Sequence, residues 1–207
     1  MRWLFIVASI AASTGAAPFA VERAPRSPGQ ATARPALDNP RVRAYRTTTA
    51  ALTTIAHGPG VVVSLENGDL GKAVWVEDAA AASGQMPLHG AVVVVQPRGR
   101  RPPAAAAGSK PGDALSTGMS FKPLFENDRV SVMRARMDVG AHEGLHTHGS
   151  DTIVVHLSGG AIEDTADART VVNRWTRGDV EFEAVGSSHS ARNVGGAVDV
   201  VLVVLKP

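Results

Sequence analysis

Five of the seven histidines of this 207-residue chain lie between residues 142 and 189. His146 and His148 are separated by one residue in a segment expected to form a strand, so their side chains leave the same face of that strand. Two neutral imidazoles on one face can bind a common Zn, Fe, Ni or Cu ion. The pair therefore indicates a metal site that is completed by ligands from elsewhere in the chain.

The residues around this pair follow a wider pattern of spacing. One motif reads Gly140, His146-Thr-His148, Thr152 and Gly159, and a second reads Gly178, Ala184, Gly186, His189 and Asn193. The order and spacing of both motifs resemble those of the cupin superfamily, with Thr152 in place of a glutamate and Ala184 in place of a proline. The resemblance covers residues 119–207 well and residues 38–97 faintly. It implies an all-β fold, the RmlC-like jelly-roll β-barrel.

By this resemblance His146, His148 and His189 are the ligands of one divalent transition metal inside the barrel, which is Fe, Zn, Mn, Ni or Cu. A threonine hydroxyl is a poor ligand at neutral pH, so Thr152 leaves a site of three neutral histidines. His142 and Glu143, just before the first ligand, are candidates for a fourth ligand. Asp151 stands one residue early, and strand alternation points it away from the site.

Three further residues are expected near the site. His156 has the same strand parity as Thr152 and therefore faces the interior, as a hydrogen-bond donor near the ligands, a proton shuttle or a satisfied core histidine. A hairpin turning near Ser150 would place His156 opposite residue 144 and close to His142. Asn193 shares the parity of His189 and is expected to hold the barrel or a bound water. Trp175 is expected in the core or barrel wall.

The resemblance implies a range of functions. Three neutral ligands leave a divalent ion its full charge and two or three open positions, where it can polarise a carbonyl, activate water or hold a chelating substrate beside dioxygen. Three-histidine cupins with a similar pattern include cysteine dioxygenase and acetylacetone dioxygenase. A metal-dependent dioxygenase acting on a small chelating organic substrate is one hypothesis. A non-catalytic metal- or small-ligand-binding module and a structural cupin without metal are the alternatives, and no catalytic residue is assigned.

Composition and strand pattern favour the same fold class. The chain is 44% hydrophobic and 19% charged, which is typical of a globular protein, and its 21 glycines and 13 prolines favour many turns. Short β-like segments separated by turn residues predict a sandwich or a small closed barrel. They are Val130–Met137, Thr152–Leu157, Thr170–Trp175, Val180–Phe182 and Val198–Leu205.

A weak internal repeat divides the chain. The segment that begins at Asn39 matches the one that begins at Asn127, and Val61–Gly68 matches Ile153–Gly160. This predicts a smaller, degenerate cupin-like β unit at 38–97, a Pro/Ala/Gly linker at 98–118 and a cupin domain at 119–207. The first unit holds only His57 and His89, so the site is expected in the second.

The N-terminal residues predict export. Met1-Arg2, an apolar stretch at 3–12 and small residues up to Ala17 are typical of a signal peptide at 1–16, followed by a flexible leader at 17–37. The expected location is secreted or periplasmic. The absence of cysteine excludes disulfides, thiolate metal sites and a cysteine nucleophile.

The expected partner is a small-molecule ligand or substrate, with a homodimer as a further possibility. A net charge of +2, with no aromatic residues among Arg98, Arg100 and Arg101, argues against nucleic acid. No membrane association is expected after signal cleavage, since no later apolar run is long enough to span a bilayer.

Overall fold

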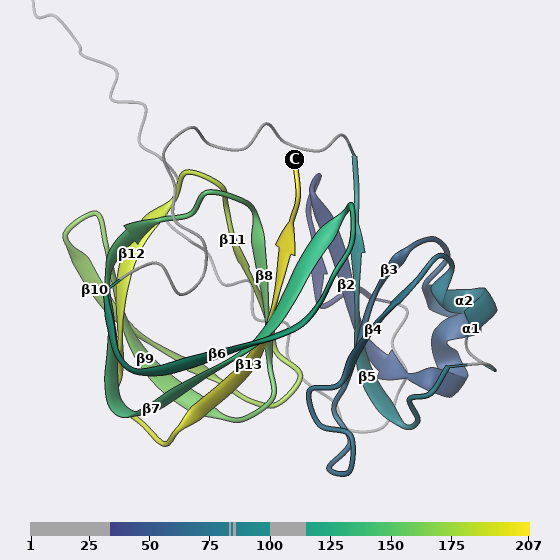
Figure 1. Ribbon diagram of the computed structural model, residues 1–207, viewed down its shortest axis with the longest axis horizontal. Coiled ribbons are helices and arrows are strands. Elements are labelled where there is room, and N and C mark those ends of the chain that lie inside the picture. Colours follow the sequence, from purple (N-terminus) through teal and green to yellow (C-terminus); the bar gives the residue numbers. More distant parts are fainter. Residues whose placement is uncertain (1–33, 83, 85, 100–114) are drawn as a thin grey trace, which may run out of the picture.

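The computed structural model describes residues 34–82, 84, 86–99 and 115–207. The predicted signal peptide at 1–16 lies outside these ranges, as do most of the leader at 17–37 and of the linker at 98–118. The described residues form two antiparallel sheets and three short helices (Figure 1). Within those ranges no helix has the length and apolar character needed to cross a membrane.

The first sheet has five strands in the order β1-β2-β5-β3-β4. Its strands are β1 (Leu37–Asp38), β2 (Val42–Thr48), β3 (Gly60–Ser64), β4 (Ala73–Val76) and β5 (Ala91–Pro97). The 3-10 helix η1 (Thr49–Ala51) and the α-helices α1 (Leu52–Ile55) and α2 (Ala79–Ala82) complete the unit. Leu52 and Ala79 pack with the buried Val62 and Val94, so the helices cover one face of this sheet.

The second sheet has eight strands, in the order β10-β9-β12-β7-β13-β8-β11, with β6 paired to β7. The strands are β6 (Ser116–Glu126), β7 (Val130–Thr147), β8 (Thr152–His156), β9 (Gly160–Ala166), β10 (Arg169–Trp175), β11 (Val180–Glu183), β12 (Ser188–Asn193) and β13 (Val198–Leu205). The sheet curls around an interior (Figure 1). The curl brings β10 and β8 together, and the rings of Trp175 and His156 stack with centroids 4.7 Å apart. The predicted all-β barrel is confirmed.

The predicted hairpin between the histidine strand and the next strand is wrong. β7 and β8 are not paired: β8 lies between β13 and β11, and His156 is opposite Val200. His142 is instead opposite Arg192 and Thr117. All five residues of β8 are buried. The two strands that pair with β8 come later in the chain, so the turn residues between β7 and β8 do not predict this pairing.

The two sheets pack against each other. Val61 and Val63 of the first sheet share one apolar cluster with Ile153, Val155 and Val201 of the barrel wall. Valine-rich runs in this chain therefore belong to strands that are covered on both faces. Alternate residues of β8 serve the two sides, since Ile153 and Val155 face the first sheet while Val154 faces the barrel interior.

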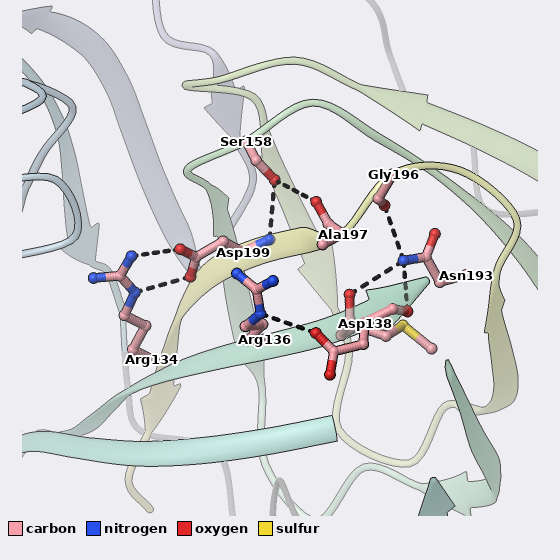
Figure 2. Close-up of polar contacts among 9 residues, drawn as sticks. Arg134, Arg136, Asp138, Ser158, Asn193, Gly196, Ala197 and Asp199 are labelled. Atoms are coloured by element: carbon pink, nitrogen blue, oxygen red, sulfur yellow. Dashed lines mark hydrogen bonds and ion pairs between the residues drawn. The ribbon is translucent and has the colours of Figure 1, made fainter. Parts of the chain in front are cut away.

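Polar contacts also join the sheets. Arg134 of β7 forms an ion pair with Asp199 of β13, drawn in Figure 2, and donates a hydrogen bond to the carbonyl of Leu70 in the first unit at 3.1 Å. The buried Asp151 accepts a hydrogen bond from Nε of Arg41 at 2.8 Å and another from the N–H of Val185 at 2.9 Å. Asp151 thus points away from the barrel interior, as strand alternation predicted.

The internal repeat corresponds to equal hydrogen bonds in the two units. The Asn39 side chain accepts from the N–H groups of Arg41 and Val42, and the Asn127 side chain accepts from those of Arg129 and Val130. The pairing β2-β5-β3-β4 is likewise repeated by β7-β13-β8-β11. The first sheet therefore repeats the half of the barrel on which it packs.

The repeat extends to one turn that requires glycine. Gly71 and Gly178 have φ angles of 77° and 85°, a region that favours glycine. Their N–H groups donate to the carbonyls of Ser64 and His156, the last residues of β3 and β8. In the first unit the face that corresponds to the barrel interior is filled by apolar residues, including those of α1 and α2.

Replacing Asp151 with alanine is expected to lower the free energy of unfolding by roughly 3 kcal/mol, because it removes a buried acceptor from both Arg41 and Val185. Urea denaturation measures this difference. The control is Asp138→Ala, since Asp138 pairs with Arg136 at an exposed position, and there we expect less than about 0.5 kcal/mol. Equal losses in the two variants would contradict the anchoring role of Asp151.

Candidate metal centre

The three motif histidines lie together in the barrel. His189 of β12 is paired directly with His146 of β7, and antiparallel partners project from the same face of a sheet. His148 follows two residues later, directly after the end of β7. Each of the three side chains offers a ring nitrogen, and these nitrogens all lie within 4.8 Å of one another. The structure thus brings together the three ligands implied by the sequence.

Hydrogen bonds orient two of these rings. Nδ1 of His146 donates to the carbonyl of Gly144 at 3.0 Å, and Nδ1 of His189 donates to the Asp164 carboxylate at 2.9 Å. In the neutral form of each ring, Nε2 is then the nitrogen that offers a lone pair to a metal. Nε2 of His189 lies 3.1 Å from Nε2 of His148. Nitrogens bound to one ion at 2.0–2.1 Å are separated by roughly 3 to 4 Å, so these residues fit a metal ion.

The protonation of the histidines differs within the cluster. Burial, together with the charges of His189 and His146, lowers the pKa of His148 to about 3. Burial also opposes a charge on His189, but the hydrogen bond to Asp164 and the negative charge of Glu183 outweigh it and raise that pKa to about 9. In the metal-free protein His148 is therefore a ready ligand, whereas His189 carries a proton that a metal must displace.

The histidines line one side of a cavity of about 110 Å³. Apolar side chains from several strands form much of its remaining wall, among them Met119, Phe121, Met137, Val154, Val200 and Leu202. A concave pocket in which apolar walls surround converging polar groups is typical of a small-molecule site. The cavity therefore has the character of a ligand pocket as well as that of a metal site.

Four carboxylates also line this cavity: Glu143, Asp164, Glu181 and Glu183. Glu143 was a candidate from the sequence, and its Oε1 lies 3.8 Å from Nε2 of His146. The other three were missed. Asp164 lies on β9, a strand that was not predicted. Glu181 and Glu183 are separated by one residue on β11, so strand alternation puts them on the same face and could have identified both. Burial, with the charge of Glu181, raises the pKa of Glu183 to about 8.

The other predicted residues fall in different places. Thr152 lines the cavity, and its hydroxyl donates to the Ser150 carbonyl at 3.4 Å. His142 is exposed on β7. The buried Asn193 lies within 2.9–3.1 Å of the carbonyls of Met137, Asp138 and Gly196 (Figure 2), so it connects β12 to β7 and to the turn before β13. Asn193 thus holds the barrel rather than contacting the cluster.

His156 lies at the deeper end of the cavity. Its ring is 2% exposed and stacks on Trp175 at an interplanar angle of 12°. Nε2 lies 3.6 Å from Oε2 of Glu181, beyond hydrogen-bond distance, and neither ring nitrogen has a hydrogen-bond partner among the described residues. A buried imidazole without a partner is costly. His156 therefore differs from the satisfied core histidine that was one of the expectations.

Replacing Asp164 with asparagine is expected to weaken zinc binding by about 10- to 100-fold, because a carboxylate behind a ligand histidine fixes its tautomer and raises its basicity. Competition with a chromophoric chelator measures the affinity. The matched control is Glu163→Gln on the same strand, since Glu163 pairs with Arg192 outside the cavity. The orienting role of Asp164 is refuted if both variants bind zinc as the wild type does.

No protein-family model and no curated protein matches this chain. Solved structures match part of it. A cupin domain from Bordetella pertussis Tohama I is 25% identical with a TM-score of 0.41, and the match covers 44% of this chain and 95% of that one. A protein from Thermotoga maritima, described as a predicted oxalate decarboxylase, is 26% identical with a TM-score of 0.37, covering 44% and 84%. The polyketide cyclase RemF from Streptomyces resistomycificus is 14% identical with a TM-score of 0.40, covering 52% and 79%.

These structures include the family to which the sequence motifs pointed. His146 lies on β7, His148 directly follows that strand and His189 lies on β12, and all three line one cavity of a curled antiparallel sheet. Residues 116–205 thus form a curled all-β barrel in which both motifs meet, with a three-histidine cluster that can hold a metal ion.

Proposed function

We propose that this protein binds one divalent transition metal through His146, His148 and His189 and is a metal-dependent oxidoreductase of the dioxygenase type. Its substrate is a small organic molecule that chelates the metal. The observation that carries the proposal is the convergence of three imidazoles on one side of an apolar cavity. A metal bound there would supply Lewis acidity and open positions for a chelating substrate and dioxygen.

The residues around the cluster support a role in positioning. The hydrogen bonds from His146 to Gly144 and from His189 to Asp164 hold two ligand rings before any metal arrives. Such preorganisation lowers the cost of binding. The donor set contains imidazole nitrogens without thiolates, which suits Fe, Zn, Ni or Cu.

The deeper end of the cavity supports an organic ligand in addition to the metal. His156 offers ring nitrogens that have no partner among the described groups, and Oε2 of Glu181 lies 3.6 Å away. A hydroxyl placed there can accept from the imidazole and donate to the carboxylate. The apolar residues that line the same cavity suit a carbon skeleton. The substrate class is therefore a small chelating molecule with a hydroxyl at its far end.

The direct test is oxygen uptake by metal-loaded protein. Metal content is measured first on protein from its native compartment, and the chain is then mixed with chelating compounds such as a β-diketone, a catechol and a 2-hydroxy acid. We expect uptake that depends on both metal and compound and that is absent from His146→Ala. Compound binding without oxygen uptake would reject the dioxygenase and favour the second candidate.

That second candidate is a non-catalytic metal- or ligand-binding module. Glu143 and Glu183 place carboxylates within 4.0 Å of ligand histidines. Carboxylates so close to the cluster can occupy the positions that an oxygenase keeps open. This observation favours storage or transport of the ion, and the oxygen-uptake experiment separates the two functions.

We also propose that the protein acts outside the cytoplasm, on the basis of the sequence at 1–16 alone. The mature exported chain should be shorter than its precursor by roughly sixteen residues. Mass spectrometry of the exported protein measures this. An intact Met1 on that protein would show that the segment is not cleaved.

A further inference from the structure

We infer that Glu183 is the fourth protein ligand of the metal, a carboxylate supplied from β11 and not from β8. The inference rests on the proposed metal site at His146, His148 and His189. It assigns a role to a residue that lies within the second motif at a position the motif leaves unspecified. The site would then take a divalent cation with three nitrogen ligands and one oxygen ligand from the protein.

The strand register places Glu183 in the cavity beside Thr152. In the antiparallel pairing of β11 with β8, Glu183 is the direct partner of Thr152. Direct partners project from the same face with Cβ atoms about 4.5–5.5 Å apart. Thr152 directs its hydroxyl to the Ser150 carbonyl. The side chain that can reach the cluster from this pair of positions is therefore that of Glu183.

The distances place the Glu183 carboxylate within one coordination sphere of the cluster. Oε2 lies 3.7 Å from Nδ1 of His148, and Oε1 lies 4.0 Å from Nε2 of His189. Two ligand atoms on one ion are at most about 4.2 Å apart, which is twice the bond length. Of these two distances, the one to Nε2 of His189 joins Glu183 to a nitrogen that faces the cluster, since His148 turns its Nε2 and not its Nδ1 toward His189. A metal bound to Nε2 of His189 can therefore also bind Oε1 of Glu183 without a change in the backbone.

The other carboxylates of the cavity are placed differently. Glu143 lies within 4.0 Å of His146 alone among the three histidines, and Glu181 lies near His156. Asp164 bonds Nδ1 of His189, on the opposite side of the ring from Nε2. Among the four carboxylates of the described cavity, Glu183 is the one that lies near two ligand histidines.

A carboxylate ligand changes what the site prefers. It reduces the net charge of the ion together with its protein ligands from +2 to +1, and it adds a hard oxygen donor to three imidazoles. Hard oxygen donors favour Mn, Fe or Zn over a soft ion such as Cu(I). A fourth protein ligand therefore favours Mn, Fe or Zn and leaves one coordination position fewer for substrate or water.

The test compares Glu183→Gln with Glu143→Gln and with the control Glu163→Gln, at a residue that pairs with Arg192 outside the cavity, using Zn²⁺ and Co²⁺ alone as probes. Glutamine keeps the shape of the side chain and removes its charge. For Glu183→Gln we expect at least about 100-fold weaker zinc binding and a changed Co²⁺ absorption spectrum. The control Glu163→Gln should stay within about threefold of the wild type, and Glu143→Gln should lose less affinity than Glu183→Gln.

A swap variant separates ligation from structure. Glu183→Thr combined with Thr152→Glu moves the carboxylate across the strand pair, and it should bind zinc within about tenfold of the wild type, whereas Glu183→Thr alone should not. A melting curve shows whether each variant is folded. If Glu183→Gln does not fold, the zinc affinity of the swap variant still tests whether a carboxylate at this strand pair binds the metal.

Three results would overturn the inference. Wild-type zinc affinity and an unchanged Co²⁺ spectrum in Glu183→Gln would do so while leaving the three-histidine site in place. A large loss in Glu143→Gln instead would assign the ligand to β7. A wild-type protein that binds neither Zn²⁺ nor Co²⁺ would refute the proposed metal site itself, and the inference with it.

Discussion

His146→Ala, His148→Ala and His189→Ala are each expected to abolish stoichiometric metal, whereas the wild-type protein holds about one ion per chain. Each variant leaves two imidazoles, and the chelate geometry made by β7 and β12 is lost with the third. Elemental analysis and titration calorimetry on the refolded, metal-loaded proteins measure the loss. No other single histidine should have this effect.

The controls for this experiment lie elsewhere on the same chain. His57 and His89 are exposed in the first unit, and His142 is exposed on β7. Alanine at any of these three positions should leave one ion per chain. Loss of metal in His142→Ala would show that the exposed ring turns inward on binding. Full metal content in His189→Ala would contradict the assignment of the cluster.

The three ligand histidines could be predicted because their placement depends on local rules. Two residues on one strand with one residue between them share a face whatever surrounds the strand. The spacing of the second motif then identified His189. Strand alternation also turned Asp151 away from the cavity, where Arg41 and the N–H of Val185 satisfy it.

The carboxylates of the cavity depend on pairing between distant strands. Glu183 enters the site because β11 pairs with β8 in a register that sets residue 183 opposite residue 152. Asp164 enters because β9 pairs with β12 and brings residue 164 opposite Ala191, two residues from His189. Such registers are set by the packing of the whole barrel, so they cannot be predicted from the sequence of one strand alone.

The same distinction applies to the first unit. Its repeat was visible because equal residues form equal turns at Asn39 and Asn127. How that unit packs was not visible, since a valine run on a strand covered by another sheet resembles one covered by helices. In this chain Val61 and Val63 face the barrel, while Val62 faces the helices.

The arrangement explains why one unit alone carries a site among the described residues. The positions that correspond to Thr152 and Glu183 in the repeated pairing are Gly60 and Val76. Neither side chain can bind a metal. The helices pack on this face instead of the further strands that bring His189 and Asp164 to the barrel interior. The first sheet thus supports the barrel wall that holds β8.

Metal affinity is expected to rise steeply between pH 6 and pH 8 and to level off above about pH 9. In the metal-free protein the pKa of His189 is about 9, and that of Glu183 is about 8. Both groups must lose a proton to bind a metal ion. Below its pKa, each such proton lowers the apparent affinity by about tenfold per pH unit. His148, with a pKa of about 3, is already neutral and adds nothing in this range.

The free energy of unfolding of the metal-free protein should fall as the pH rises, whereas the metal affinity increases. The folded pKa of His189 is raised above its ordinary value of 6.5, so its contribution is present below pH 6.5 and is lost as the pH rises through about 9. The folded pKa of Glu183 is also raised, from 4.5, so folding favours its neutral form and stability falls between pH 4.5 and 8. Added zinc should therefore raise the melting temperature more at pH 8 than at pH 6.

Calorimetry in buffers with different ionisation enthalpies counts the protons that are released. At pH 7 we expect about two protons for each zinc ion, one from His189 and one from Glu183. Asp164→Asn removes the negative charge that holds the His189 proton, so that variant should release fewer protons. An affinity that is flat or falls between pH 6 and pH 8 would show that these groups are not protonated in the metal-free cavity.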